Sequence, residues 1–129
     1  MTAGGPPVQA ISGLPQPTGA FLTALGLELT QMTGTRVTGT ITLTAEHHTP
    51  WGIVHGGVHA ATIESAASIG ASHAVRDAGQ VAVGLTNTTH FLRPVTAGEV
   101  SVEARAVHQG RGQQLWQVKI TDDPCRVIA

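Results

Sequence analysis

Residues 51–79 read WGIVHGGVHAATIESAASIGASHAVRDAG, and this stretch decides the fold. From Gly56 onward it is rich in alanine and contains no proline, which favours one helix of about six turns over residues 56–78. Gly79 is suited to end that helix, because glycine readily adopts the left-handed conformation of a C-terminal cap. The side chains are small or apolar on nearly every side, so the pattern predicts a helix that is buried rather than lying on a surface.

The residues before this helix alternate in the manner of β-strands. Residues 36–46 place a small or apolar set on one face and a mainly polar set on the other, which is typical of a half-buried antiparallel strand. Gly34 indicates a hairpin turn before it, and an earlier strand begins near Leu27. The residues expected to face inward are Val37, Gly39, Ile41, Leu43 and Ala45.

Three further strand signals follow the helix, over residues 81–92, 100–108 and 115–121. The inward-facing residues of the last two would be Val100, Val102, Ala104, Ala106, Trp116, Val118 and Ile120. The order is therefore two strands, one long helix and about three strands. An antiparallel sheet wrapped around a single helix satisfies that order with short connections, so the predicted fold class is α+β.

One domain is expected from a length of 129 residues. Residues 1–17 contain four of the seven prolines and predict a flexible lead-in, which leaves residues 18–129 for the domain. A short helix over residues 21–25, ended by Gly26, would lie near its start.

The composition limits the classes of partner. Only 12% of the residues are charged and the net charge is −1, so no basic surface points to nucleic acid. A small domain with so little charge is expected to leave apolar surface for other subunits to cover. The single cysteine, Cys125, is expected to be an inert packed thiol in a reducing compartment. Because neither a signal peptide nor a membrane span is recognisable, the expected location is cytoplasmic, with no membrane partner.

Glu64 is the only formally charged residue between Glu46 and Arg76, and it lies in the middle of the predicted helix. An unpaired carboxylate in an apolar setting is costly, so a glutamate kept there is a candidate catalytic residue. The alternative is a glutamate that has a partner or lies on an exposed polar stripe. Ser68 is one turn further on the same face and could hold a water beside the carboxylate, or could bond back to the Glu64 carbonyl.

His55, Gly56 and Gly57 stand at the start of the helix, where first-turn N–H groups lack intrahelical partners. Such an end can bind a carbonyl oxygen or a developing oxyanion, although a Gly-Gly pair also occurs as ordinary turn chemistry. Glu64 follows Gly56 by eight residues, which separates them by about 12 Å along one helix. A reacting carbonyl must contact both groups, so a shared site would need two subunits.

Four histidines near the helix start are candidate metal ligands. His55 and His59 are one helical turn apart, and His47 and His48 lie nearby. The run lacks the glutamate that a zinc protease carries beside its first histidine, and no third ligand stands at a recognisable spacing. Neither a metal nor another cofactor is expected.

The run WGIVHGGVHAATIESAAS resembles the signature of hotdog-fold acyl-CoA thioesterases of the phenylacetate-pathway and 4-hydroxybenzoyl-CoA type. In that signature, G-x-x-H-G-G is followed seven residues later by Asp or Glu in the central helix. The similarity extends over residues 25–129, including HFLRPVTAGE and VHQGRGQQLWQV. It implies a hotdog thioesterase domain that converts an acyl-CoA to a free acid and coenzyme A as a homodimer or homotetramer. The matching positions are Gly52, His55, Gly56, Gly57 and Glu64.

The resemblance also implies catalytic roles. The Gly56 N–H would polarise the thioester carbonyl, and Glu64 of the opposite subunit would attack that carbonyl or activate water. Ser68 matches a position that helps to place the water, and His55 would orient the loop or contact the thioester. Glutamate at position 64, rather than the commoner aspartate, resembles the 4-hydroxybenzoyl-CoA subtype.

Substrate binding is expected at Thr49, Gly57, Arg93 and Arg111. Thr49 stands where the family often carries Asn or Gln, and its shorter side chain can still donate one hydrogen bond. The two arginines suit the phosphates of coenzyme A, although each could be a solvated turn residue. The acyl group implied is aromatic or of short to medium length.

Two alternative functions stay open at this point. The same fold serves acyl-CoA hydratases and dehydratases, whose catalytic histidine and acid could be matched by His55 and Glu64. The other alternative is a non-catalytic acyl-CoA-binding module, which usually carries an effector segment such as a DNA-binding helix-turn-helix.

Overall fold

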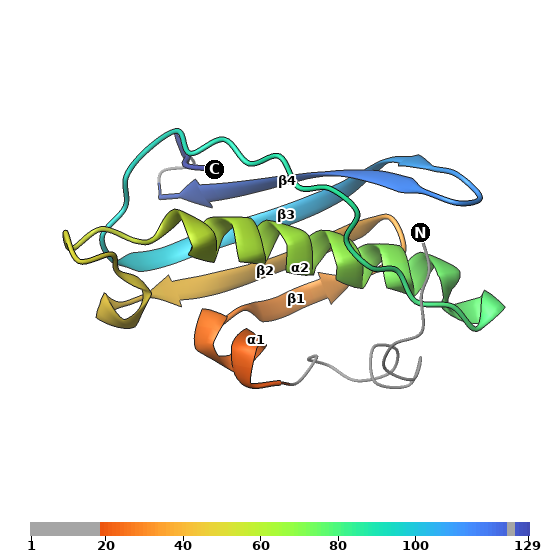
Figure 1. The fold of residues 1–129 in the computed structure, drawn as a ribbon, viewed down its shortest axis with the longest axis horizontal. Coiled ribbons are helices and arrows are strands. Elements are labelled where there is room, and N and C mark those ends of the chain that lie inside the picture. Colours follow the sequence, from red (N-terminus) through yellow and green to blue (C-terminus); the bar gives the residue numbers. More distant parts are fainter. Residues whose placement is uncertain (1–18, 124–125) are drawn as a thin grey trace.

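The computed structural model describes residues 19–123 and 126–129. The lead-in expected over residues 1–17 and the packed thiol expected at Cys125 lie outside the described residues. Within them, one antiparallel sheet packs against one long helix (Figure 1), which confirms the predicted α+β class. None of the helices in this part of the chain has the length and hydropathy that a membrane crossing requires.

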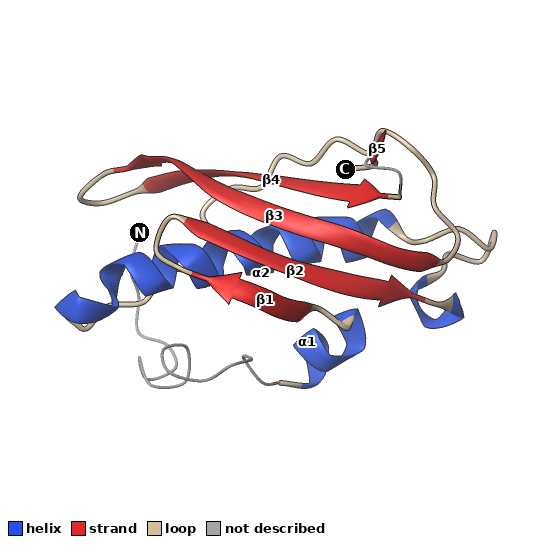
Figure 2. Cartoon of the chain, turned by 180° about the vertical axis from the view of Figure 1, so that it is seen from behind, coloured by secondary structure: helices blue, strands red, loops and turns tan. Residues whose placement is uncertain are grey.

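In the described part of the chain, five strands form the sheet in the order β1-β2-β3-β4-β5, and every neighbouring pair is antiparallel. They are β1 (Glu28–Met32), β2 (Arg36–Leu43), β3 (Gly98–Gln109), β4 (Gln114–Asp122) and β5 (Arg126–Val127). Gly34 lies in the turn between β1 and β2, as predicted. Figure 2 shows the sheet from the side opposite the long helix.

The long helix, α2 (Gly56–Val75), follows the predicted extent. The His55 side chain caps its start by accepting a hydrogen bond from the Gly57 N–H at 2.7 Å. After Val75 the chain continues as one 3-10 turn, η3 (Arg76–Ala78), and Gly79 then adopts a left-handed φ of 73°. The stop predicted at Gly79 is therefore confirmed, with 3-10 geometry in the last turn.

Among residues 19–123, two short helices flank β1 and β2. The first, α1 (Ala20–Leu25), ends at Gly26 with a φ of 75°, which confirms the predicted short helix. The second, the 3-10 turn η2 (Ala45–His47), begins where residues 36–46 were expected to continue as a strand. Ala45 is exposed in this turn, so the prediction that it faces the core is wrong. Alternating residues share a face only while the backbone stays extended.

The core lies between α2 and the inner face of the sheet. Alternation along β2, β3 and β4 sends one set of side chains inward, as predicted. The buried members of that set are Val37, Gly39, Ile41, Leu43, Val100, Val102, Ala104 and Ile120. Ala106, Trp116 and Val118 are half-buried on the same face.

Only one side of α2 is buried in the single chain. That side packs on the sheet, and its buried residues are His59, Thr62, Ala66, Ile69, Gly70, Ala71 and Ser72. Glu64 and Ala74 are exposed on other sides. The prediction of a helix buried nearly all round is wrong for the single chain, because a sheet on one side covers one helix face.

No strand forms over residues 81–92, where one was predicted. We call residues 80–97 the crossing segment, because this stretch passes across α2 (Figure 1) before reaching β3. The Asn87 side-chain amide fastens it to α2 by donating to the Ala60 carbonyl oxygen at 2.9 Å. Its composition suited extended backbone, but a strand also needs a hydrogen-bonded neighbour, which local pattern does not specify.

Candidate active site

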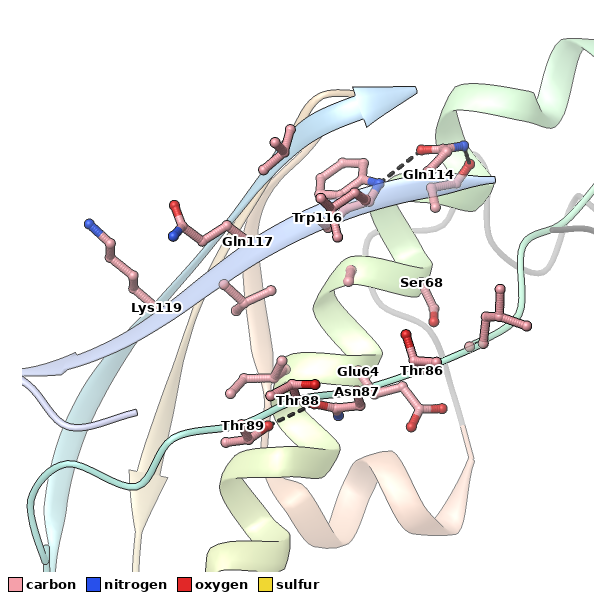
Figure 3. Close-up of a pocket in the computed structure, with 18 of the residues that line it drawn as sticks. Glu64, Ser68, Thr86, Asn87, Thr88, Thr89, Gln114, Trp116, Gln117 and Lys119 are labelled. Carbon is pink, nitrogen blue, oxygen red and sulfur yellow. Dashed lines mark hydrogen bonds between the residues drawn. The ribbon is translucent and has the colours of Figure 1, made fainter. Parts of the chain in front are cut away.

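A cavity of about 900 Å³ opens between α2, the crossing segment and β4. This volume is near the upper end of the range for ligand pockets. Figure 3 shows Glu64 and Ser68 on α2, with Thr86 of the crossing segment near them. The α2 residues that line the cavity are Ile63, Glu64, Ala67, Ser68 and Ala71, which recur at the spacing of one helix face.

The Glu64 carboxylate lies in this cavity without a protein partner. The side chain is exposed in the single chain, so the prediction that it is buried is wrong there. Within residues 19–123 and 126–129, no hydrogen bond or ion pair reaches the carboxylate. The alternative of an exposed glutamate therefore describes the Glu64 side chain correctly. The side chain nevertheless lines a cavity, where it is available to react with a ligand.

The crossing segment approaches Glu64 closely at Gly84. A Cβ atom at Gly84 would lie 2.9 Å from Glu64 Oε2 and 3.1 Å from its Cδ, closer than such atoms normally pack. A glycine is therefore what allows the segment to run beside the carboxylate. The Asn87 bond to the Ala60 carbonyl holds the same segment against the helical turn that leads into Glu64.

Ser68 lies one turn beyond Glu64 and lines the same cavity. Its hydroxyl makes no hydrogen bond to any described residue, so the bond back to the Glu64 carbonyl that the sequence allowed is not formed. Thr62 shows the contrast, because its Oγ1 donates to the Val58 carbonyl oxygen at 2.7 Å. The Ser68 hydroxyl is thus free to hold a water or substrate atom.

At the start of α2, one backbone donor is left unused. The Gly57 N–H donates to His55 Nδ1, and the Val58 N–H donates to the His55 carbonyl oxygen at 2.9 Å. The Gly56 N–H has no acceptor in the part of the chain that the structure describes. It lies at the positive end of the helix dipole, where an oxygen carrying negative charge is stabilised. A Cβ at Gly56 would lie 3.1 Å from the Phe91 ring, so that ring lies beside the donor.

The histidines near this end have separate structural roles. Because His55 Nδ1 accepts a hydrogen bond, the proton of its neutral ring is on Nε2. His47 Nδ1 accepts from the Thr44 N–H, and its Nε2 donates to the Ala24 carbonyl oxygen at 3.0 Å. Burial lowers the pKa of His59, whose ring lies 6.4 Å from that of Phe91. No three metal-binding side chains gather in residues 19–123 and 126–129.

Gly56 and Glu64 belong to one unbroken helix, as predicted. Eight residues at the helical rise separate them by about 12 Å. One α2 therefore cannot place both the free N–H and the carboxylate on the same carbonyl group.

The expected substrate-binding residues lie in different places. Thr49 forms a tight turn, in which its Oγ1 accepts from the Trp51 N–H at 3.2 Å. The Arg93 N–H donates to the Ile128 carbonyl oxygen at 3.4 Å, and Ile128 pairs with Ile120 near the end of β4. Arg111 lies in the turn before β4 begins at Gln114, so roughly 20 Å of strand separates the two arginines. A single chain does not bring them together.

The structure adds residues that sequence reasoning missed. Gly84 and Asn87 position the crossing segment, and nothing in their local pattern identified them. Trp116 was expected only as an inward-facing residue, yet it also lines the cavity. Gly70 did carry a signal, because a glycine inside a helical pattern costs stability relative to alanine and so invites a search for a packing reason.

Comparison with known proteins shows which family this chain resembles in sequence. The family model described as the thioesterase superfamily matches residues 52–129. A 1,4-dihydroxy-2-naphthoyl-CoA hydrolase of Listeria monocytogenes is 33% identical over 104 residues, which cover 81% of this chain and 84% of that protein. A proposed esterase of Mycobacterium tuberculosis is 48% identical over 80 residues, 60% of this chain, and the match spans 57% of the length of that relative.

Solved structures agree with these matches. The structure of the Mycobacterium tuberculosis protein is 38% identical over 85% of this chain and 89% of that one, with a TM-score of 0.82. The E. coli PaaI protein of the phenylacetic acid degradation operon is 26% identical over 86% of this chain and 78% of that one, with a TM-score of 0.76. The family model matches more than half of this chain, and the chain folds as a sheet packed on one long helix. This chain therefore belongs to the thioesterase superfamily and has its hotdog fold.

Proposed function

We propose that the protein hydrolyses acyl-CoA thioesters to a free acid and coenzyme A, in sites that two subunits share. The carrying observation is that the Gly56 N–H and the Glu64 carboxylate, both on α2, have no partner among the described residues. A free N–H at a helix start stabilises an oxyanion, and a free carboxylate acts as a base or nucleophile. Family membership supports the thioester bond, and the name of the Listeria relative supports coenzyme A as the thiol.

The shared site follows from the geometry of α2. A two-fold axis beside the exposed face of α2 would run two copies of the helix antiparallel. Gly56 of one subunit could then face Glu64 of the other, which the separation of about 12 Å forbids within one helix. The low charge content and the uncovered side of α2 support such an interface. We propose a homodimer as the minimal unit, with a tetramer as the larger form.

The reaction can run in two ways with the same groups. As a base, Glu64 takes a proton from water, and the oxygen of that water adds to the thioester carbon while the Gly56 N–H binds the carbonyl oxygen. The C–S bond then breaks, and the proton passes to the leaving thiolate. As a nucleophile, Glu64 adds to the same carbon and expels the thiolate, and water then hydrolyses the resulting anhydride.

The remaining residues have supporting roles in this proposal. Ser68 holds the attacking water beside Glu64, and His55 can donate from Nε2 toward the thioester while its Nδ1 fixes Gly57. Thr49 provides a contact from the turn before α2. Arg93 and Arg111 bind phosphates of coenzyme A.

A thiol-release assay across benzoyl-, phenylacetyl-, short-chain and long-chain acyl-CoA tests the proposal together with Glu64→Gln. Thiol release by Glu64→Gln should fall about 100-fold or more, because the amide can neither attack nor accept the proton. The melting temperature should change little, since the exposed carboxylate has no ion pair to lose.

Glu99→Gln is the matched control, because Glu99 is also exposed and lies on β3 outside the cavity. It should keep the wild-type rate. Wild-type protein that binds these esters without releasing thiol would instead indicate a binding module. Addition of water to an enoyl-CoA, with no thiol released, would indicate a hydratase. Either outcome would refute thioester hydrolysis.

A further inference from the structure

Further along α2 from Glu64, the cavity is lined by the side chain of Trp116. In Figure 3, Glu64, Ser68 and then Trp116 follow one another in the direction of the helix axis. Trp116 projects from β4 toward α2, and both its ring and the Ala71 turn line the cavity. The indole is half-buried and is one of only two tryptophans in the chain.

Hydrogen bonds hold the indole in one orientation. Trp116 Nε1 donates to Gln114 Oε1 at 2.8 Å, and Gln114 Nε2 donates to the Ala71 carbonyl oxygen at 3.2 Å. Gln109 Nε2 donates to the same Gln114 oxygen at 3.0 Å and to the Gly34 carbonyl oxygen at 2.6 Å. The side-chain amide of Gln114 therefore ties the ring to α2, to β3 and to the β1–β2 turn.

Gly70 lets the ring pack directly on the helix backbone. A Cβ atom at Gly70 would be 2.4 Å from Trp116 Cη2, a distance at which one of the groups must move. The indole thus fills the gap between β4 and α2 at Gly70. Six residues of helix separate Gly70 from Glu64, so the indole packs roughly 9 Å along the helix from the carboxylate-bearing turn.

We infer that Trp116 limits the size of the acyl group by projecting into its path at this distance, although the cavity lining continues past the indole to Gln114. The inference rests on the proposed thioester hydrolysis, because it assumes that the reacting carbonyl lies at Glu64. Between that point and the indole the helix side is formed by Ala67 and Ser68, whose small side chains leave room for an acyl group. The space suits an aromatic ring or a medium chain, and a long fatty chain would meet the indole.

The test is kcat/KM for a series of acyl-CoA esters from acetyl to palmitoyl, with benzoyl included, for wild type and Trp116→Leu. Removing the indole should raise kcat/KM for palmitoyl-CoA relative to benzoyl-CoA by about 10-fold or more, the scale on which a hydrophobic pocket discriminates chain length. Trp116→Phe keeps an aromatic ring in the core and should shift the ratio in the same direction by less. It serves as the second variant if Trp116→Leu does not fold.

Trp51→Leu is the matched control. Trp51 is 84% exposed on the loop before α2 and does not line the cavity, so the same substitution there should leave the acyl-size profile unchanged. A folded Trp116 variant with the wild-type profile would refute this role of Trp116 while leaving thioester hydrolysis intact. Wild type that releases no thiol from any ester would refute the proposed function itself, so the two failures are distinguishable.

Discussion

At the residue scale, Glu64 differs from the carboxylates that arginines hold on the strands, and it also lines the cavity. Glu103 accepts hydrogen bonds from Arg36 and Arg105, and these bonds lower its pKa. Asp122 is likewise bonded to Arg126 at 2.8 Å. The carboxylate of Glu64 and the N–H of Gly56 have no such partner among the described residues. Groups that satisfy no structural need are the ones available to a substrate.

Gly56→Pro tests the backbone donor, because proline has no N–H. Proline is well accepted at the first position of a helix, and His55, with φ −67° and ψ 133°, has the extended backbone that must precede it. Loss of an oxyanion donor should reduce kcat by about 100- to 1,000-fold. Gly56→Ala adds a comparable contact with Phe91 but keeps the N–H, so it should stay close to wild type. Equal activity of the two variants would remove Gly56 from the mechanism.

At the element scale, the site depends on how the crossing segment lies on α2. Asn87 fastens the segment to the Ala60 carbonyl, and Gly84 leaves the space that the Glu64 side chain occupies. Neither residue needs to touch substrate to matter. Together they set the position from which the carboxylate enters the cavity.

Gly84→Ala should therefore displace the Glu64 carboxylate, because the new Cβ would lie 2.9 Å from Oε2. We expect kcat to fall by about 10-fold or more, as a shift of about 1 Å in a reacting group can cost more than that. The carboxylate is a mobile side-chain end, so the melting temperature should hardly change. Gly112→Ala is the control, because nothing lies within 4 Å of a Cβ there. A Gly84→Ala enzyme with wild-type kcat would contradict this positioning role.

At the scale of the whole molecule, one chain contains both halves of a site but cannot join them. The free N–H and the free carboxylate are held about 12 Å apart by an unbroken α2. The side of that helix away from the sheet is uncovered, so a second copy has a face on which to pack. Assembly would then complete two equivalent sites per dimer.

Mixing two inactive variants tests this arrangement. Glu64→Gln subunits keep a working Gly56, and Gly56→Pro subunits keep a working Glu64. If the groups meet across the interface, dissociating and reassociating the mixture should restore about a quarter of wild-type activity, because half of the randomly formed dimers carry one intact site of two. Sedimentation at micromolar concentration should show dimers or tetramers, and thiol release should be lost when they dissociate to monomers. A mixture that stays inactive although mixed dimers form would refute a site that Gly56 and Glu64 share across the interface.

The sequence alone determined the elements and their faces. A long alanine-rich run without proline must form a helix, and strict alternation over Val37 to Leu43 must send one set of side chains inward, because both follow from local backbone geometry. The motif from Gly52 to Glu64 likewise includes Gly56 and Glu64, two groups that have no partner among the described residues. Its spacing by itself showed that Gly56 and Glu64 could not meet within one helix.

Tertiary structure alone decided what those elements contact. Residues 81–92 were predicted to form a strand, but they pair with no neighbouring strand and cross α2 instead. Glu64 is exposed rather than buried, because burial depends on which side the sheet covers. The close approaches of Gly84 to Glu64 and of Trp116 to Gly70 join residues far apart along the chain. Contacts between distant segments depend on the packing of the whole fold, and no local pattern records them.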